Sequence, residues 1–386
     1  MKKLIIILTL LTVGCSQYTY KDLIIPADLK PDYKSPENIS SKQLKEDTGL
    51  LKYALKKAYG GRFVISKEIL KNAYDELDAI QGDMTTQKYC DQIGEALAKI
   101  PDYHLHVRYN GALCPKTEKK TPSSIGENIA KGKTWVVEKR KYKGKNYLLI
   151  AISGFPSNQS KKWDGFMEQV KKLHNPKLPV VFDLRSNGGG DDTFGYRLSA
   201  FFHKASEGLN FPTPYEKQIT SQTAETQVLK MNVADFWLRG EVSETEPLIS
   251  YRTEQENILK EILSGKLPEK KVSINDKVSE NWTFSGYPNP IYILMNEHCF
   301  SSCESTIDSF EYNPHVKKIG LATGGMIHFG NVSPLFLKHS RVYIQIATHA
   351  NTYFDGRFIE KKGIQPDIEV PAGKDALEYT LENYLN

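Results

Sequence analysis

The sequence predicts an α/β protein in which a helical N-terminal part precedes a core built on a mainly parallel β-sheet. Between residues 50 and 100, apolar residues recur every three or four positions, as they do on helices with one buried face. From residue 147 onward, short apolar runs alternate with helical patterns. Such β–α–β alternation requires crossover connections and favours parallel strands. A glycine-rich turn after one strand and a serine-rich junction after another indicate a site at the carboxyl edge of this sheet.

Residues 1–14 have the layout of a secretion signal peptide. Lys2 and Lys3 precede the apolar run 4–11, which is too short to span a bilayer. Residues 11–15 (LTVGC) resemble a bacterial lipoprotein box, which makes Cys15 the predicted lipid-bearing N-terminus; the alternative is an ordinary signal with a chance cysteine. Several acyl chains on one cysteine would give stable anchoring. Ser16, in place of Asp, favours the bacterial outer membrane, so we expect an exported, lipid-anchored cell envelope protein.

The helical subdomain is expected over residues 42–105, after a lipidated tether at 15–41 that carries three prolines and little periodicity. Its three helices are predicted from apolar stripes at 50–58, 69–80 and 89–100; glycines end the first and Pro101 ends the third. Residues 102–109 alternate as a strand does and place His104 and His106 on the same face.

The core is expected over residues 106–386, with an insertion at about 203–287 that is polar, punctuated by prolines and weakly helical. Its predicted elements are, in order, a strand pair at 135–141 and 147–153, a helix around 163–173, a strand at 179–184, a helix around 194–202, a strand at 291–295, a helix to about 312, a strand at 316–321, a hairpin of 335–337 with 342–347, a turn at 363–367 and a short helix from 375.

Charge and composition exclude several functional classes. Hydrophobic residues make up 40% and charged residues 25% of the chain, which is ordinary for a globular protein. Removal of Lys2 and Lys3 lowers the formal net charge from +5 to +3, which is too small to indicate a nucleic-acid partner. The sequence has no Cys/His spacing typical of a metal site and no phosphate-binding glycine loop, so we expect no metal and no cofactor. Nothing in it indicates an oligomeric state.

Four cysteines remain beyond Cys15, and they allow three disulfide connectivities. A bond between Cys90 and Cys114 would tie a helix to the loop after the next strand. Cys299 and Cys303 lie one helical turn apart. All four could instead be free residues that pack in the core.

Ser301 lies between the apolar strand 291–295 and the following helix. Hydroxyl residues at such a junction cap the helix through their side-chain oxygens. They also leave the first helical N–H groups free to bind negative charge, so a serine there is well placed as a nucleophile beside an oxyanion site. From these residues alone, Ser301 and Ser302 could equally be caps and nothing more.

Residues 183–190 (DLRSNGGG) directly follow a buried strand. Three consecutive glycines let the backbone turn sharply and expose N–H groups at the edge of the sheet. The spacing matches no phosphate-binding loop, and a plain tight turn is the simplest interpretation. Together with the later serine junction, however, the loop favours an oxyanion site.

These motifs together resemble the C-terminal processing (tail-specific) serine peptidases. The resemblance rests on residues 183–190, on residues 301–304 (SSCE), on residues 319–325 (IGLATGG) and on residues 363–367 (GIQPD), in that order. It covers roughly residues 45–205 and 285–372. It implies a crotonase-like β/α core with a helical N-terminal part, and a protein or peptide substrate.

Two departures indicate which branch the chain resembles. No stretch between residues 107 and 147 looks like the PDZ domain of the tail-specific members, and Met326 stands where their lysine base would follow the glycine. A PDZ-less branch, which includes the tricorn core protease and a secreted chlamydial protease, uses Ser, His and Glu instead. Its histidine lies in an Asp-x-His motif and its glutamate precedes the Gly-Ile-x-Pro turn, which are His104 and Glu360 here.

The resemblance therefore implies a serine endopeptidase that works through an acyl-enzyme. Ser301 would attack the carbonyl, His104 would transfer the proton, and Glu360 would orient the imidazole, directly or through another group. The N–H of Ser302 and one from Gly189 or Gly190 would form the oxyanion hole.

Several alternatives stay open at this point. Other nucleophiles are possible at Ser302, Ser305 and Cys303, and His106 is the rival base. Asp183, Arg185 and Asn187 are expected to hold the glycine loop rather than to touch substrate. A non-catalytic protein that binds peptides or another ligand on the same fold is the main functional alternative, and a distance from His104 to Ser301 well beyond 6 Å would favour it. A third possibility is an inhibited form in which the insertion covers the cleft.

Overall fold

The structure is a computed structural model that describes residues 18–115, 123–156, 162–204, 211–240, 245–278 and 284–385. The predicted signal peptide and Cys15 lie outside the described residues. Within those residues, no helix combines the length and the apolar character needed to cross a membrane.

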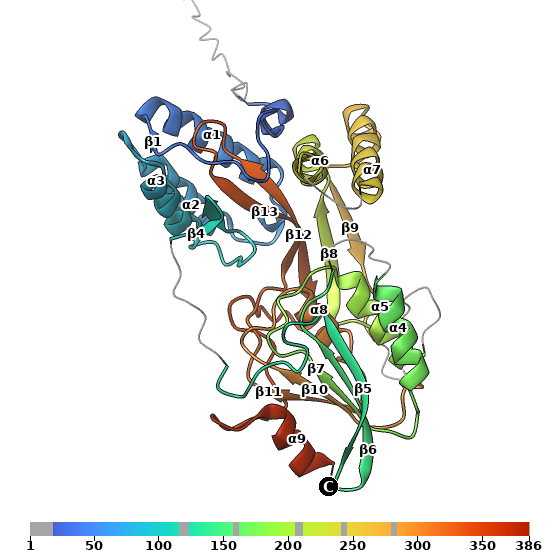
Figure 1. Ribbon diagram of the computed structural model, residues 1–386. Helices are drawn as coiled ribbons and strands as arrows, with labels where there is room; N and C mark the ends of the chain where they lie inside the picture. Colours follow the sequence, from blue (N-terminus) through green and yellow to red (C-terminus); the bar gives the residue numbers. More distant parts are fainter. Residues whose placement is uncertain are drawn as a thin grey trace, which may run out of the picture.

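The first sheet forms the lower half of the molecule in Figure 1 and has the order β14-β11-β10-β7-β6-β5. Its strands are β5 (Trp135–Tyr142), β6 (Lys145–Ile152), β7 (Val180–Asp183), β10 (Ile291–Met295), β11 (Val316–Gly320) and β14 (Ile368–Glu369). All neighbouring pairs are parallel except β5 with β6. The parallel strands β7 and β10 are buried along their whole length, as a strand covered on both faces must be.

Helices cover both faces of this sheet. On one face, the side chains of α4 (Lys162–Leu173), α5 (Asp192–His203) and α8 (Ser302–Asp308) form a core around Trp163, Phe194 and Ile307. On the other face, α9 (Ala376–Tyr384) packs against alternate residues of the same strands. The predicted α/β class with a mainly parallel sheet is confirmed.

The second sheet is antiparallel, has the order β4-β3-β13-β8-β9 and adds β12 beside β13. Its strands are β3 (Val107–Tyr109), β4 (Ala112–Cys114), β8 (Tyr215–Ser221), β9 (Lys270–Ile274), β12 (Phe329–Phe336) and β13 (Tyr343–Tyr353). The N-terminal helices share one hydrophobic core with β12 and β13. In Figure 1 this sheet links the N-terminal helices to the first sheet.

The N-terminal helical part is also confirmed. It contains, in order, η1 (Tyr20–Leu23), β1 (Asn38–Ile39), α1 (Ser41–Lys57), η2 (Gly60–Phe63), α2 (Lys67–Ala79), β2 (Met84–Thr85) and α3 (Thr86–Leu97). Side-chain oxygens of Ser40, Ser66 and Thr85 cap α1, α2 and α3 by accepting backbone N–H groups of the first turn.

Three expectations differ from the structure. The tether is shorter than 15–41, because Leu23, Ile25 and Leu29 are buried against the domain. The described part of the insertion is not merely weakly helical: β8 and β9 extend the second sheet, while α6 (Ala224–Leu238) and α7 (Glu246–Leu263) pair with each other. The strand expected at 102–109 begins only at Val107. The Asp102 carboxylate accepts the N–H groups of His104 and Leu105, and this local bonding replaces a sheet ladder.

The structure resolves the cysteine pairing. Cys90 is bonded to Cys114, which ties α3 to β4, and Cys299 is bonded to Cys303.

Candidate active site

Ser301 occupies the junction between β10 and α8 in an unusual backbone conformation. Its φ is 55° and its ψ is −118°, which an L-residue adopts only where its surroundings impose it. The serine hydroxyl makes no capping bond to the helix. Ser301 and Glu304 do have the arrangement of a capping box, with the Ser301 side chain facing the Glu304 backbone, but the hydroxyl makes no capping hydrogen bond of normal geometry and is available for chemistry.

A hydrogen bond to the glycine loop and a disulfide hold the junction between β10 and α8. The Phe300 N–H donates to the Asn187 carbonyl at 3.0 Å, which joins the serine junction to residues 183–190. The Cys299–Cys303 disulfide spans Ser301 from one side of the turn to the other.

Glu304 lies beneath the junction and was not singled out by the sequence reasoning. Its buried carboxylate accepts the backbone N–H of Ser301 at 3.1 Å and that of Met326 at 2.7 Å. It also accepts the Thr323 hydroxyl at 2.6 Å and the Gly325 N–H at 2.8 Å. One carboxylate thus fixes the nucleophile's backbone and the loop that carries Met326. The Ser-x-x-Glu spacing of residues 301–304 is that of a capping box, and it could have identified Glu304.

The sequence predicts His104 as the base and Ser301 as the nucleophile, and the structure brings these two side chains into contact. Its Nε2 lies 3.1 Å from the Ser301 Oγ, which is hydrogen-bonding distance. The backbone of His104 is fixed by Asp102, whose carboxylate accepts its N–H, and by Gln345, whose amide donates to its carbonyl. Burial lowers the pKa of His104 to about 3, so the imidazole is neutral at physiological pH and can accept a proton.

Glu360 lies beside His104 but does not bond to it directly. One nitrogen of His104 and one oxygen each of Asp102 and Glu360 lie within 4.8 Å of one another. The buried Nδ1 of His104 has no hydrogen-bond partner among the described residues. The Glu360 carboxylate accepts three backbone N–H groups, those of Tyr103 at 2.9 Å, Ile327 at 3.1 Å and His328 at 3.0 Å.

The acids around His104 are buried and bond no cationic side chain among the described residues. Burial raises the pKa of Asp102 above its ordinary range. Burial, followed by the negative charge of Asp102, raises the pKa of Glu360. The Tyr59 hydroxyl donates to Asp102 at 2.8 Å. The two carboxyl groups therefore compete for a proton near neutral pH, directly beside the imidazole.

This group is the one set of side chains in the described ranges with spacing suited to a metal ion. Its oxygens are already committed, however. The two Asp102 oxygens accept two backbone N–H groups and the Tyr59 hydroxyl, and the two Glu360 oxygens accept three N–H groups. The arrangement fits a proton-transfer site better than a metal site.

The predicted oxyanion donors lie against Ser301, but they are not equivalent. The Gly189 N–H donates to the Asn187 side chain at 2.9 Å and is therefore engaged. Among the described residues, no acceptor is bonded to the N–H of Gly190 or of Ser302, and the Ser302 hydroxyl donates to the Gly190 carbonyl at 2.6 Å. A Cβ at Gly189, where φ is +94°, would lie 2.9 Å from the Ser301 Cβ. Gly189 thus allows close approach, and Gly190 is the better donor candidate.

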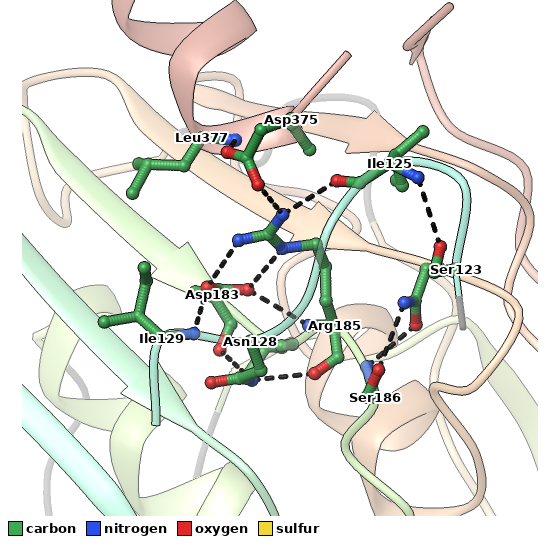
Figure 2. Close-up of polar contacts among 12 residues, drawn as sticks. Ser123, Ile125, Asn128, Ile129, Asp183, Arg185, Ser186, Asp375 and Leu377 are labelled. Carbon is green, nitrogen blue, oxygen red and sulfur yellow. Dashed lines mark hydrogen bonds and ion pairs between the residues drawn. The ribbon is translucent and has the colours of Figure 1, made fainter. Parts of the chain in front are cut away.

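A buried ion-pair network holds the start of the glycine loop (Figure 2). Arg185 donates to both oxygens of Asp183 at 2.9 Å, and its third nitrogen bonds Asp375 at 2.9 Å. The Asn128 amide donates to the carbonyls of Asp183 and Arg185. The Asn296 side chain accepts the Ser186 N–H at 2.8 Å, which connects this loop to the end of β10. None of these groups bonds Ser301.

The remaining candidates, and His328 beside the site, have other roles in the structure. The ring of His328 accepts the Ile359 N–H through Nε2, and that of His106 accepts from Arg108. The Ser305 hydroxyl donates to the Ser302 carbonyl within α8, and Cys303 is held in a disulfide.

Comparison with known proteins identifies the family of the chain. Residues 146–370 match the model of peptidase family S41. This match spans more than half of the chain. The chain belongs to peptidase family S41. It is therefore a serine peptidase, and protein or peptide substrates follow from the family. None of the curated proteins matches the chain in sequence.

Two solved structures are similar to the chain in fold. One is a candidate peptidase from Parabacteroides merdae, with 15% sequence identity, a TM-score of 0.51, and coverage of 90% of this chain and 98% of that one. The other is mature CPAF, with 12% identity, a TM-score of 0.52, and coverage of 88% and 95%. At these identities the likeness concerns the fold alone.

Proposed function

We propose that this protein is a serine endopeptidase in which Ser301, His104 and Glu360 act together through an acyl-enzyme. The observation that carries the proposal is the 3.1 Å contact between the His104 Nε2 and the Ser301 Oγ. The serine makes no capping bond, and the imidazole is neutral. A free hydroxyl beside a neutral base is the arrangement that nucleophilic catalysis by serine requires.

The reaction would proceed in two halves. Ser301 Oγ attacks the substrate carbonyl while His104 Nε2 takes its proton, and the oxyanion is bound by the N–H groups of Ser302 and Gly190. His104 then returns the proton to the leaving amine, which leaves the acyl group on Ser301. In the second half, a water molecule attacks the ester while His104 Nε2 takes a proton from it. His104 then transfers this proton to Ser301 Oγ as the acid product leaves.

The role proposed for Glu360 is electrostatic. It lies within 4.8 Å of the imidazole and does not accept a bond from Nδ1. When His104 gains a proton, the ionised member of the Asp102–Glu360 pair stabilises the imidazolium, because attraction between charges is strong in a buried site. Three backbone N–H donors fix the position of the Glu360 carboxylate.

Two observations argue against the alternatives drawn from the sequence. A pure binding protein would not need a base at 3.1 Å from a free serine, well inside the 6 Å limit. None of the hydrogen bonds of Ser301, His104 or Glu360 goes to a described residue of the insertion, which offers no support for an inhibited form.

The test is cleavage of an unfolded protein substrate such as casein by the mature chain. The wild type should cleave it, and Ser301→Ala should abolish cleavage. Ser264→Ala, which changes a serine at the end of α7, should cleave as the wild type does. Binding of the substrate without cleavage by the wild type at every pH between 6 and 9 would instead support the binding protein.

We also propose that the mature chain is anchored to the cell envelope through an acylated Cys15. The sequence of residues 11–15 supports this proposal. Incorporation of labelled palmitate by the wild type and its loss in Cys15→Ser would agree with it, and equal labelling of both would contradict it.

A further inference from the structure

Helices α1 and α2 enclose a continuous basic groove at the surface of the N-terminal part. One hollow of about 910 Å³ lies along α1. A second, of about 610 Å³, shares Lys52, Lys56 and Asp78 with it and extends toward the start of α2. We call the combined surface the α1–α2 groove. The catalytic residues do not line it.

The groove carries a strong excess of positive charge. It is lined by seven basic side chains and three carboxylates, so its formal charge is +4, whereas the chain without Lys2 and Lys3 carries only +3. The carboxylates are already paired: Asp78 with Lys52, Asp75 with Lys71, and Glu46 with His339. The basic residues are Lys42, Lys45, Lys52, Lys56, Arg62, Lys67 and Lys71.

Four of these lysines form one stripe along α1. Lys42, Lys45, Lys52 and Lys56 follow each other at spacings of three, seven and four residues, which places them on one side of a helix. Lys42, Lys45 and Lys56 are exposed and form no ion pair with another described residue. Another side of α1 is buried in the core through Leu51, Ala54 and Leu55.

The chain enters the described structure in the middle of this stripe. The ring of Tyr18 packs on Tyr53 with centroids 6.0 Å apart, and its hydroxyl donates to the Glu46 carbonyl at 3.0 Å. Gly49, between Lys45 and Lys52, provides the space: a Cβ there would lie 2.5 Å from the Tyr18 hydroxyl. Three residues span at most about 10 Å, so Cys15 stays within about that distance of Tyr18.

We propose that the α1–α2 groove docks on a membrane surface rich in anionic phospholipid headgroups. The inference rests on the anchor proposed at Cys15, which would bring the membrane within reach of the stripe. Its charge complements anionic headgroups, which attract nearby lysines electrostatically. An acidic peptide has the same sign of charge, but nothing holds it beside Tyr18.

Docking would orient the whole peptidase. In Figure 1, α1 and η1 lie at one end of the molecule, and α9 and the β5–β6 end of the first sheet lie at the other. With α1 on the membrane, the first sheet would extend away from the lipid. Substrates in the aqueous compartment would then reach the site without obstruction by the membrane surface.

The test is vesicle co-sedimentation of the mature chain with Cys15→Ser, so that binding reports the groove and not the acyl chains. Vesicles of equimolar phosphatidylglycerol and phosphatidylcholine should bind the protein, vesicles of phosphatidylcholine alone should not, and raised salt should reverse binding. The triple variant Lys42→Gln, Lys45→Gln and Lys56→Gln should bind roughly 100-fold more weakly.

The matched control removes three exposed lysines from the β5–β6 hairpin: Lys139→Gln, Lys141→Gln and Lys145→Gln. It changes the net charge equally and should leave binding unchanged. Circular dichroism and casein cleavage show whether each variant is folded and active, independently of binding. An equal loss in both triple variants, or no loss in either, would overturn the proposal. Binding to poly-glutamate without binding to anionic vesicles would also overturn it, in favour of an acidic peptide.

Discussion

Two regions of the molecule bury carboxylates with different kinds of hydrogen-bond partner. Asp183, at the end of β7, is fully buried and receives two bonds from the Arg185 guanidinium (Figure 2). Asp102 and Glu360, beside His104, are also buried, but their bonded partners are backbone N–H groups and the Tyr59 hydroxyl. A buried carboxylate with a cation keeps a fixed charge, whereas one without a cation can exchange protons. The first arrangement suits a scaffold and the second suits catalysis.

The largest effect on catalysis is expected from the loss of His104, the base that contacts Ser301. His104→Ala should lower kcat by about 10⁶-fold, because loss of the base in a serine peptidase removes most of the catalytic advantage. His106→Ala is the matched comparison, since His106 lies two residues away and bonds Arg108 instead of Ser301. It should keep most of the activity. Casein cleavage by both variants checks this expectation, and equal losses would contradict it.

Loss of the buried ion pair between Asp183 and Arg185 should lower the stability of the protein. Asp183→Asn removes one partner of a buried ion pair and leaves Arg185 uncompensated, which should cost about 3–5 kcal/mol of unfolding free energy. Urea denaturation of the wild type and the variant measures this cost. The folded fraction of the variant should retain the reactive Ser301. A variant as stable as the wild type would show that the pair does not hold the loop.

Glu360→Gln should lower the catalytic rate more than the stability of the protein. The amide keeps the shape of the side chain but cannot offer a negative charge to the imidazolium. We expect kcat to fall by about 10²–10³-fold, less than the 10⁴-fold loss typical of a directly bonded triad acid, because Glu360 lies near His104 without bonding it. Stability should change by less than in Asp183→Asn. An unchanged kcat would remove Glu360 from the proposed mechanism.

The smallest expected effect is a pH dependence of stability. The pKa values of Asp102 and Glu360 are raised in the folded protein, and burial raises that of Glu304 to about 7. Above pH 6.5, histidines are largely neutral in both states, while these carboxyl groups keep protons that the unfolded chain has lost. The folded state then binds more protons, so its stability should fall as pH rises from 6.5 toward 8.

Urea denaturation at a series of pH values measures this slope. Glu360→Gln removes one of the groups and should flatten it. Below pH 6.5 the slope should become shallower, because burial lowers the pKa of His104 to about 3 and that of His106 to about 4, which opposes the effect of the carboxyl groups. Those rings stay neutral when the unfolded chain is protonated. A stability that rises with pH between 6.5 and 8 would contradict the assignment.

The sequence predicted the features that depend on local pattern. The stripes at 50–58, 69–80 and 89–100 lie on α1, α2 and α3, because helical periodicity survives tertiary packing. His104 and Ser301 were paired through their motifs, although 197 residues separate them along the chain, and their side chains do meet.

Features that depend on tertiary contacts could not be predicted in this way. The bonding of the Asp102 side chain shortened the strand expected at 102–109. The insertion forms strands only because β13 provides a partner for β8. The spacing of four cysteines could not choose among three connectivities. Nor does any pattern reveal that the Gly189 N–H is engaged by Asn187, or that the His104 Nδ1 lacks a direct bond to Glu360.

The most direct test of the account is the site and rate of labelling by a fluorophosphonate, which reacts with activated serines. The mature wild type should be labelled, and peptide mapping by mass spectrometry should find the label on Ser301 alone. Labelling should be lost in His104→Ala and retained in His106→Ala. A label on another serine, or undiminished labelling of Ser301 in His104→Ala, would contradict the claim that His104 activates Ser301.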